Sequence, residues 1–146
     1  MRILLDEDTP VQLIEPMKHV LPSHQIDHVT GLRGWSGKAD SAVYADAKKR
    51  RYDALVTKDR NQLSDPPHVT MVRKSGLHRV AFKQRHVGLL GLSIAMGSVL
   101  AAIVPVMAEL IAADGQRLVH ITGIDPSKRR YDIVDPRRDP PTYWRG

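Results

Sequence analysis

The sequence contains no cysteine and few aromatic residues, and both shortages restrict what the chain can be. Without cysteine among its 146 residues, it cannot form disulfides, thiolate nucleophiles, zinc–thiolate sites or iron–sulfur clusters. This composition fits the reducing cytoplasm, which is where we expect the protein to act. Because only 5% of the residues are aromatic, the hydrophobic core must be built from Val, Leu, Ile, Met and Ala.

Acidic residues are outnumbered by basic ones, and no targeting segment is evident. The formal net charge is +6 and the isoelectric point is about 9.8. A basic balance favours a polyanionic partner, above all nucleic acid, although a protein that is merely soluble and basic has the same charge. The apolar run Ile3–Leu5 is too short for the core of a signal peptide.

Charged residues are missing altogether from residues 87–108, a run long enough to cross a membrane. We interpret it instead as part of a helix over residues 89–113 that lies on a sheet, and we expect no membrane association. The large apolar residues of this run fall on one helical stripe: Leu92, Met96, Val99, Ile103, Met107 and Leu110. The opposite side is small, so a neighbouring helix, a second protomer or a partner protein can pack there, and we expect a homodimer.

Strand-like and helix-like segments alternate along the chain. Strands are expected at residues 2–6, 25–29, 53–57, 77–83 and 116–123, with a sixth at 130–134. Helices are expected from Thr9 onward, where Val11 faces inward and Pro16 causes a kink or an early end, and at residues 40–51 and 89–113. Residues 61–68 are read as turns. This alternation predicts an α/β domain with a mainly parallel sheet of about five strands over residues 1–135, followed by a basic Pro- and Arg-rich tail at 136–146.

Acidic residues follow two of the predicted strands. Asp6 and Asp8 come after the first strand, and Asp59 follows the third. Ligands of parallel sheets bind at the carboxyl ends of the strands, so these acids are expected to meet there. Carboxylates repel each other unless a cation lies between them, and hard oxygen ligands select Mg²⁺ or Mn²⁺. Such a metal activates water and stabilises charge on a phosphoryl group, which predicts a metal-dependent nuclease.

Most of these acids also have a simpler interpretation. Asp8 could cap the first helix, and Asp40 could cap the second. Glu7 alternates away from Asp6 along the strand and could face solvent. Asp59 could cap a short turn after the third strand. Asp6 is the hardest to explain in this way, because it ends a buried apolar strand at the expected ligand edge.

Three segments resemble the motifs of a family of small PIN-like proteins. Residues 3–10 (ILLDEDTP) resemble its N-terminal LLDENLP signature, and residues 24–29 (HQIDHV) are similar to its GHDVxHV strand. Residues 55–61 (LVTKDRN) are similar to its LVTxDxDF motif. The order and spacing agree over residues 1–63, which is less than half of the chain.

The resemblance implies a three-layer α/β/α PIN-like fold and the activity of a metal-dependent endoribonuclease with Mg²⁺ or Mn²⁺ as cofactor. Many PIN proteins are toxins of toxin–antitoxin pairs, so RNA and a cognate antitoxin protein are the implied partners. The family's metal-binding acids correspond to Asp6, Asp40 and Asp59. Asp8 replaces the family's Asn and can also bind metal, while Glu7 matches an acid of the motif.

The third motif departs from the family pattern. Asn61 replaces its second acid, and Gln62 replaces the aromatic residue that follows. Asn can coordinate a metal through its carbonyl but brings no charge. This departure keeps open a second hypothesis, in which a catalytically weak or inactive PIN-like module binds RNA or a protein. Lys58 and Arg60, beside the third strand's acid, are candidates to bind the phosphate.

Two further features remain open. Lys83 and Arg85, followed by His86, could bind the phosphates of RNA or could be a solvated charge run. The acids of residues 6–9 are also similar to the DxDxT motif of haloacid dehalogenase phosphatases. However, Thr9 comes one residue too early and Pro10 occupies the required place, so this is a minor alternative.

Overall fold

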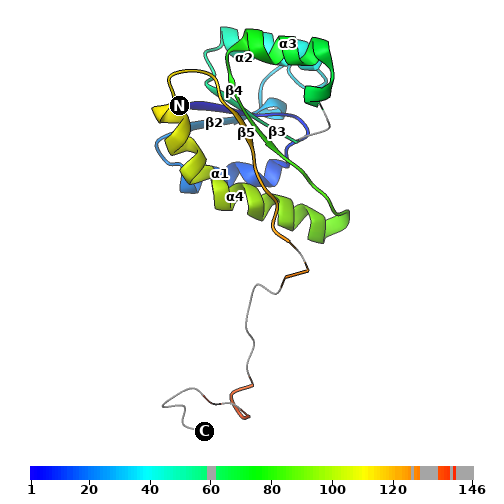
Figure 1. The fold of residues 1–146 in the computed structure, drawn as a ribbon, viewed down its shortest axis with the longest axis vertical. Helices are drawn as coiled ribbons and strands as arrows, with labels where there is room; N and C mark the ends of the chain where they lie inside the picture. Colours follow the sequence, from blue (N-terminus) through cyan, green and yellow to red (C-terminus); the bar gives the residue numbers. More distant parts are fainter. Residues whose placement is uncertain (59–61, 126, 129–134, 139, 141–146) are drawn as a thin grey trace.

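The fold is an open parallel sheet with helices on both faces (Figure 1). The computed structural model describes residues 1–58, 62–125, 127–128, 135–138 and 140. Its strands are β1 (Arg2–Leu5), β2 (Gln25–His28), β3 (Ala54–Lys58), β4 (His78–Phe82) and β5 (Leu118–His120). Its α-helices are α1 (Ile14–Val20), α2 (Asp40–Lys49), α3 (Pro66–Ser75) and α4 (Gly88–Ala112). Short 3₁₀ helices are η1 (Val11–Leu13), η2 (Val29–Gly31) and η3 (Gln62–Ser64).

The strand order is β2-β1-β3-β4-β5, and within the described ranges every neighbouring pair is parallel. Ile3 of β1 lies opposite Ile26 of β2 on one side and Ala54 of β3 on the other. The central strands are apolar on both faces, as a sheet covered on both sides requires. The predicted α/β class and the five-stranded parallel sheet are thus confirmed.

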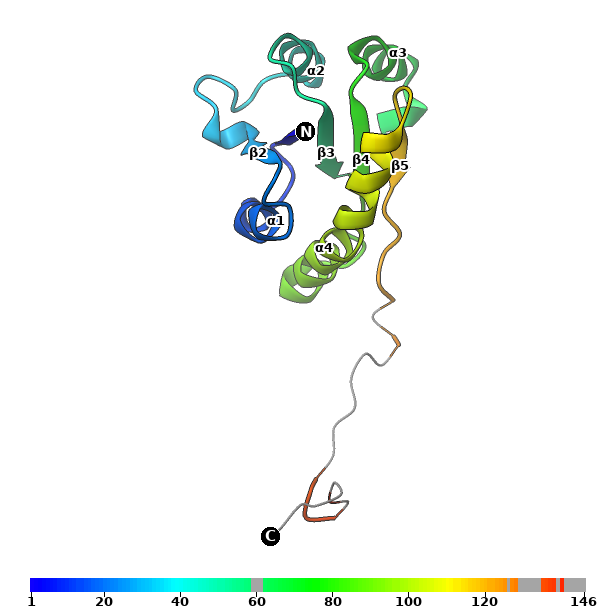
Figure 2. The ribbon, with the colours of Figure 1, turned by 90° about the vertical axis from the view of Figure 1, so that its left-hand side faces the viewer.

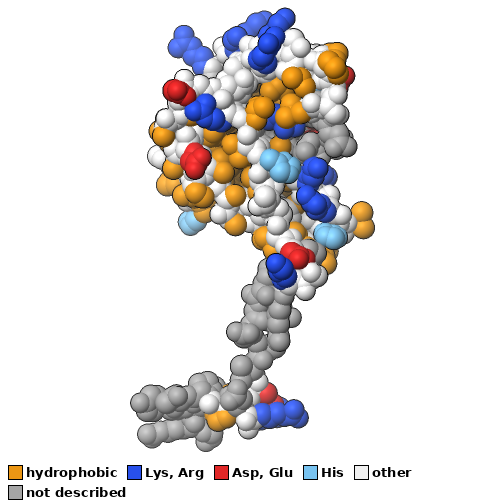
Figure 3. All heavy atoms as spheres, in the orientation of Figure 1, with side chains coloured by type: hydrophobic (Ala, Val, Ile, Leu, Met, Phe, Trp, Pro, Cys, Tyr) orange, Lys and Arg blue, Asp and Glu red, His pale blue; other side chains and the backbone are white. Residues whose placement is uncertain are grey.

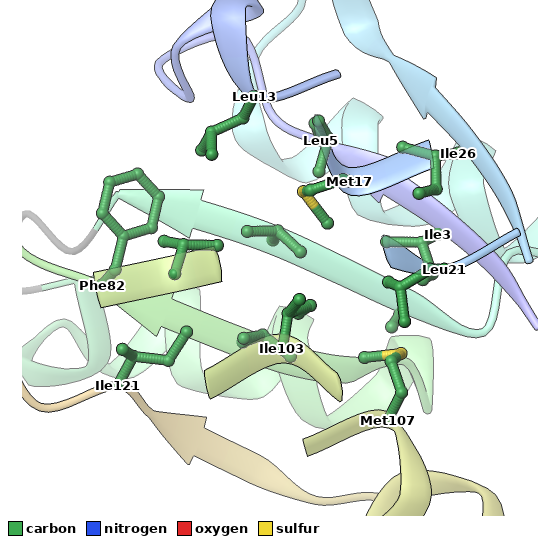
Figure 4. Packing of buried hydrophobic residues seen from close by; sticks show 14 of the residues in the cluster. Ile3, Leu5, Leu13, Met17, Leu21, Ile26, Phe82, Ile103, Met107 and Ile121 are labelled. Carbon is green, nitrogen blue, oxygen red and sulfur yellow. The ribbon is translucent and has the colours of Figure 1, made fainter. Parts of the chain in front are cut away.

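Helices cover the sheet in two layers (Figure 2). Helices α2 and α3 lie on one face, and α1 and α4 lie on the other. Because side chains alternate along a strand, Ile3 and Leu5 contribute to the core beneath α1 and α4, while Leu4 contributes to the core beneath α2. Figure 4 shows the first of these cores, in which Met17 of α1 and Ile103 of α4 pack over the strands.

The first α-helix begins at Ile14 and not at Thr9, where the sequence predicted its start. The turn η1 precedes α1, and Pro16 occupies the third position of α1, where its missing N–H has no helical partner to lose. The predicted inward position of Val11 is wrong: its side chain is 49% exposed, and Leu13 is buried instead. Thr9 does not cap the helix, since its hydroxyl donates to the carbonyl of Val56.

The interpretation of residues 61–68 as turns is wrong in its second half. Helix α3 begins at Pro66, and Pro66 and Pro67 occupy its first two positions. Proline is tolerated there because the first N–H groups of a helix have no partner within it. Gly76 ends the helix in the left-handed conformation at φ +71°. The prolines start a helix here rather than a turn.

Helix α4 lies where the uncharged run predicts it. Val99, Ile103, Met107 and Leu110 of the predicted stripe are buried, and Val104 and Ile111 are 50% and 59% exposed. In the described part of the chain, α4 is the one helix whose length and composition would suffice to cross a membrane. The buried residues of the stripe pack against the sheet. The opposite side of α4, here called the outer stripe, exposes the apolar side chains of Val104 and Ile111.

The C-terminal part of the chain is described only in pieces. Strand β5 has three residues and is shorter than the prediction of 116–123. The sixth strand predicted at 130–134 lies outside the described residues, as do residues 141–146 of the predicted tail.

Candidate functional site

The sheet has its topological switch point between β1 and β3. The chain leaves β1 for β2 on one side and returns to β3 on the other. In open α/β sheets, ligands bind in the crevice at the carboxyl ends of the strands at this point. Asp6 directly follows β1, and Lys58 is the last residue of β3. The topology therefore places the first predicted acid at the position where a ligand is expected.

Asp6 is nearly buried, with 8% of its surface exposed. Its Oδ1 accepts a hydrogen bond of 2.8 Å from the backbone N–H of Glu7, and its Oδ2 accepts one of 3.0 Å from the hydroxyl of Thr57. Burial raises the pKa of Asp6, the two hydrogen bonds oppose this, and the negative charges of Asp40 and Glu7 raise it further. A bound cation would favour the ionised form of this carboxyl.

Asp8 connects the segment after β1 to the end of β3. Its Oδ1 accepts a hydrogen bond of 3.3 Å from the backbone N–H of Lys58. The capping role considered for Asp8 is wrong, because Pro10 is the N-cap of η1 and Leu13 is that of α1. Asp8 thus lies at the switch point with Asp6.

Asp40 reaches the site from another element. It is the first residue of α2, and Ala39 occupies the N-cap, so Asp40 is not the cap of this helix. An acid in the first turn interacts favourably with the helix dipole. The charge of Asp40 contributes to the raised pKa of Asp6, which places the two carboxyls within electrostatic range of each other. The two acids, which lie 34 residues apart in the sequence, are therefore within electrostatic range of each other in the fold.

Glu7 is exposed, as its alternation with Asp6 predicts, but it has a structural contact. Both of its carboxylate oxygens accept from the backbone N–H of Gly37, at 3.1 and 3.2 Å. Gly37 has φ +77°, a conformation that favours glycine. Glu7 therefore fastens the glycine-rich loop of residues 31–37 beside the site.

A buried tyrosine lies near the acids and a buried arginine lies near this tyrosine, and sequence reasoning missed both. Tyr44, one turn after Asp40 on α2, is 2% exposed, and Arg79 of β4 is 3% exposed. Burial raises the pKa of Tyr44 to about 12, the positive charge of Arg79 lowers it, and the charges of Asp6 and Asp40 raise it. The signal for Arg79 was present, since it is a cation inside the strand predicted at residues 77–83. Arg79 adds a buried positive charge close to Tyr44.

The remaining predicted residues are distributed as follows. Asp59, Arg60 and Asn61 lie outside the described residues. Lys58 is half-buried at the end of β3, whereas Lys83 and Arg85 are exposed after β4. In the described part of the chain, no three His, Asp or Glu side chains are placed closely enough to form a metal-binding group.

The chain has no counterpart in the comparisons with known proteins. No family model, no curated protein and no solved structure matches it. The fold and the site define a doubly wound α/β protein with a nearly buried acid at its switch point.

Proposed function

We propose that the protein is a Mg²⁺- or Mn²⁺-dependent endoribonuclease. The observation that carries this proposal is Asp6: an almost buried carboxyl at the switch point, whose pKa is raised by burial and by the nearby Asp40. A carboxyl whose pKa is raised both by burial and by a neighbouring charge, at a ligand-binding edge of a sheet, is a candidate for a functional site. The resemblance of residues 1–63 to PIN-like motifs points to the same chemistry.

The oxygen donors near the switch point are of the type that a hard divalent cation binds, although the described acids do not yet form a compact group. Asp6, Asp8 and Asp40 offer carboxylate oxygens, and we propose Asp59 as a further ligand from its place in the sequence. When bound, the metal would supply an activated water and stabilise charge on the scissile phosphate. Thr57 holds one oxygen of Asp6, which fixes the orientation of the carboxyl. Lys58 and Arg60 are proposed to bind the phosphate.

The toxin role, a cytoplasmic location and the protein partners belong to this proposal. The outer stripe of α4 exposes Val104 and Ile111 at 50% and 59%. A second copy of the chain or an antitoxin would bury the exposed half of these side chains, which is worth about 1 kcal/mol each. This apolar stripe supports a protein partner.

The activity is tested by cleavage of a 5′-labelled single-stranded RNA with 1 mM MnCl₂, a concentration chosen at about the weak end of protein metal sites, or with EDTA. We expect cleavage only with the metal, and a rate at least about 100-fold lower for Asp6→Asn, since the metal contributes several kcal/mol to the barrier. Asp114→Asn is the matched control, because the side chain of Asp114 is 94% exposed and pairs with Arg117, which precedes β5 and so lies at the opposite edge of the sheet from Asp6. Full activity of Asp6→Asn would exclude the mechanism.

A second candidate function is a binding module without catalysis. It is favoured by Asn61, which replaces an acid of the family motif, and by the lack of a compact metal-binding group among the described residues. Titration with Mn²⁺ separates the two functions. The module predicts that RNA or protein binds while no Mn²⁺ binds at millimolar concentration, whereas the nuclease requires the metal to bind.

A further inference from the structure

A cavity of about 680 Å³ lies at the carboxyl ends of β4 and β5. This is the same edge of the sheet that carries Asp6 after β1. The walls of the cavity come from the segment after β4, from the first turns of α4 and from the segment after β5. The charged residues and histidines in its lining are Lys83, Arg85, His86, His120 and Asp125. None of them belongs to the acidic site described above.

Two close contacts shape the walls of this cavity. Gly91 lets the backbone of His86 approach α4, since a Cβ atom at position 91 would lie 1.6 Å from the His86 carbonyl oxygen. On the other side, the hydroxyl of Ser98 donates to the carbonyl of Ile94 and accepts from the backbone N–H of Ile124 at 3.1 Å. The segments after β4 and β5 are therefore both fixed to the same helix.

The cavity has a positive balance. Lys83 and Arg85 bring two positive charges, and His86 and His120 add rings that can donate hydrogen bonds or stack. The acid among the lining residues is Asp125, and its Oδ1 accepts from the N–H and the hydroxyl of Ser127 at 2.9 and 2.7 Å. Figure 3 shows His side chains beside side chains of the Lys and Arg colour, with one acidic side chain below them, on the face that carries the segment leading from β5.

The strand order sets the distance between this cavity and Asp6. Asp6 follows β1, Lys83 follows β4, and His120 ends β5, which are two and three strands away in the order β1-β3-β4-β5. Since neighbouring strands are about 4.8 Å apart, the cavity begins roughly 10–15 Å from Asp6 along the same edge. A few nucleotides of extended RNA can bridge this distance.

We propose that the cavity binds the backbone of single-stranded RNA, a few nucleotides from the bond that lies over Asp6. This inference rests on the proposed function and adds the path of the substrate. Lys83 and Arg85 bind phosphates, and the rings of His86 and His120 stack with unpaired bases. A duplex keeps its bases stacked inside and cannot use those rings, so the site selects single strands.

Binding is measured without cleavage, by fluorescence anisotropy of a 5′-labelled single-stranded RNA with the full chain in EDTA. For a single strand, each lost phosphate contact lowers the salt slope by about 0.7, so the double variant Lys83→Gln/Arg85→Gln should bind about 25-fold more weakly at 0.1 M salt and lose about 1.4 from the slope. The matched control is Lys49→Gln/Arg73→Gln, which removes the same charges from exposed positions on α2 and α3. It should bind nearly as tightly as the unmodified chain.

The histidines give a second readout. His120→Leu removes a ring that can stack, while His120→Phe keeps a ring without a charge. Stacking is worth about 1–3 kcal/mol per base, which corresponds to about 5- to 150-fold in affinity. We expect this loss for His120→Leu and retention of most affinity for His120→Phe.

Each outcome bears on the proposal. Equal binding by the Lys83/Arg85 variant and the unmodified chain would overturn it, and so would equal losses in the two double variants, which would show a general charge effect. Tighter binding of duplex than of single-stranded RNA would also overturn it. If Mn²⁺ produces no cleavage but binding depends on Lys83 and Arg85, the nuclease function fails and the cavity stands as an RNA site. If cleavage occurs but binding is unchanged in the variant, the cavity proposal alone fails.

Discussion

Replacement of Asp6 by Asn removes a nearly buried charge while keeping the shape of the side chain. The Asn carbonyl can still accept from the N–H of Glu7, and its amide group can donate to the hydroxyl of Thr57. The charge that burial and Asp40 disfavour is lost. Without metal, we therefore expect Asp6→Asn to be at least as stable as the unmodified protein at pH 8.

The pH dependence of this difference has a defined sign. The pKa of Asp6 in the folded state is raised above its ordinary value of 3.8. The folded state then holds the Asp6 proton more tightly than the unfolded state, so its contribution to stability is present below pH 3.8 and is lost as the pH rises through the folded pKa. The advantage of Asp6→Asn in EDTA should accordingly be small near pH 3.8 and grow toward neutral pH.

If the proposed metal binds, it should reverse the order of stability of the two proteins. Mn²⁺ at 100 times its dissociation constant stabilises a protein that binds it by about 2.7 kcal/mol. For a domain of this size, each kcal/mol raises Tm by roughly 2–4 °C, so the unmodified chain should gain about 5–10 °C. Asp6→Asn should gain far less, because it lacks the proposed central ligand.

The assay is thermal unfolding followed by circular dichroism, in EDTA and in MnCl₂, from pH 4 to pH 8. Asp114→Asn serves as the control and should behave like the unmodified chain, since Asp114 is exposed. The reasoning is refuted if Asp6→Asn gains the same Tm from Mn²⁺ as the unmodified chain. It is also refuted if the variant loses more than about 2 kcal/mol in EDTA, because that loss is typical of breaking a structural charge interaction.

Three other predictions concern neighbouring parts of the molecule. Asp40→Asn should lower the pKa of Asp6 and weaken Mn²⁺ binding about tenfold, as measured by calorimetry, because ligand charge sets affinity. Met107→Ala should cost about 2–5 kcal/mol in urea unfolding, whereas Ile111→Ala should cost much less, since Met107 is 1% and Ile111 59% exposed. Val104→Lys should convert a dimer to a monomer in light scattering, and a dimer unchanged by it would exclude the outer stripe of α4 as the interface.

The sequence predicted those parts of the fold that follow from apolar periodicity. Residues 3–5 form a short buried run that ends in an acid, and the same pattern recurs at residues 54–57 with an acid two residues beyond. A buried strand with alternating helices requires a parallel sheet, and a parallel sheet brings its strand ends to one edge. These rules were enough to place Asp6 at the switch point.

The starts of α1 and α3 were predicted less well, because the local sequence at each is compatible with two structures. Pro66-Pro67 is compatible both with a turn and with the first turn of a helix, and Val72, which packs in the core, decides for the helix. Val11 and Leu13 both precede α1, and the 3₁₀ turn rotates Leu13 rather than Val11 toward the sheet. Periodicity alone does not show where a 3₁₀ turn replaces an α-helical turn.

The residues that surround the acids could not be predicted from the sequence. Tyr44 and Arg79 lie on elements that meet only through the packing of α2 on the sheet, and no local pattern connects positions 44 and 79. Asp40 was considered as a cap because Asp is common at the N-cap. The extended backbone of Ala39 takes that position instead, which leaves Asp40 in the first turn, near Asp6.

The central claim is that acids from separate elements bind one divalent cation at the switch point. Anomalous diffraction from a crystal soaked in MnCl₂ tests it most directly. The account predicts a manganese peak bound by Asp6 and by at least one of Asp8 and Asp40, with metal–oxygen distances of about 2.2 Å. A soaked crystal without such a peak, or with manganese bound only away from Asp6, would contradict the account.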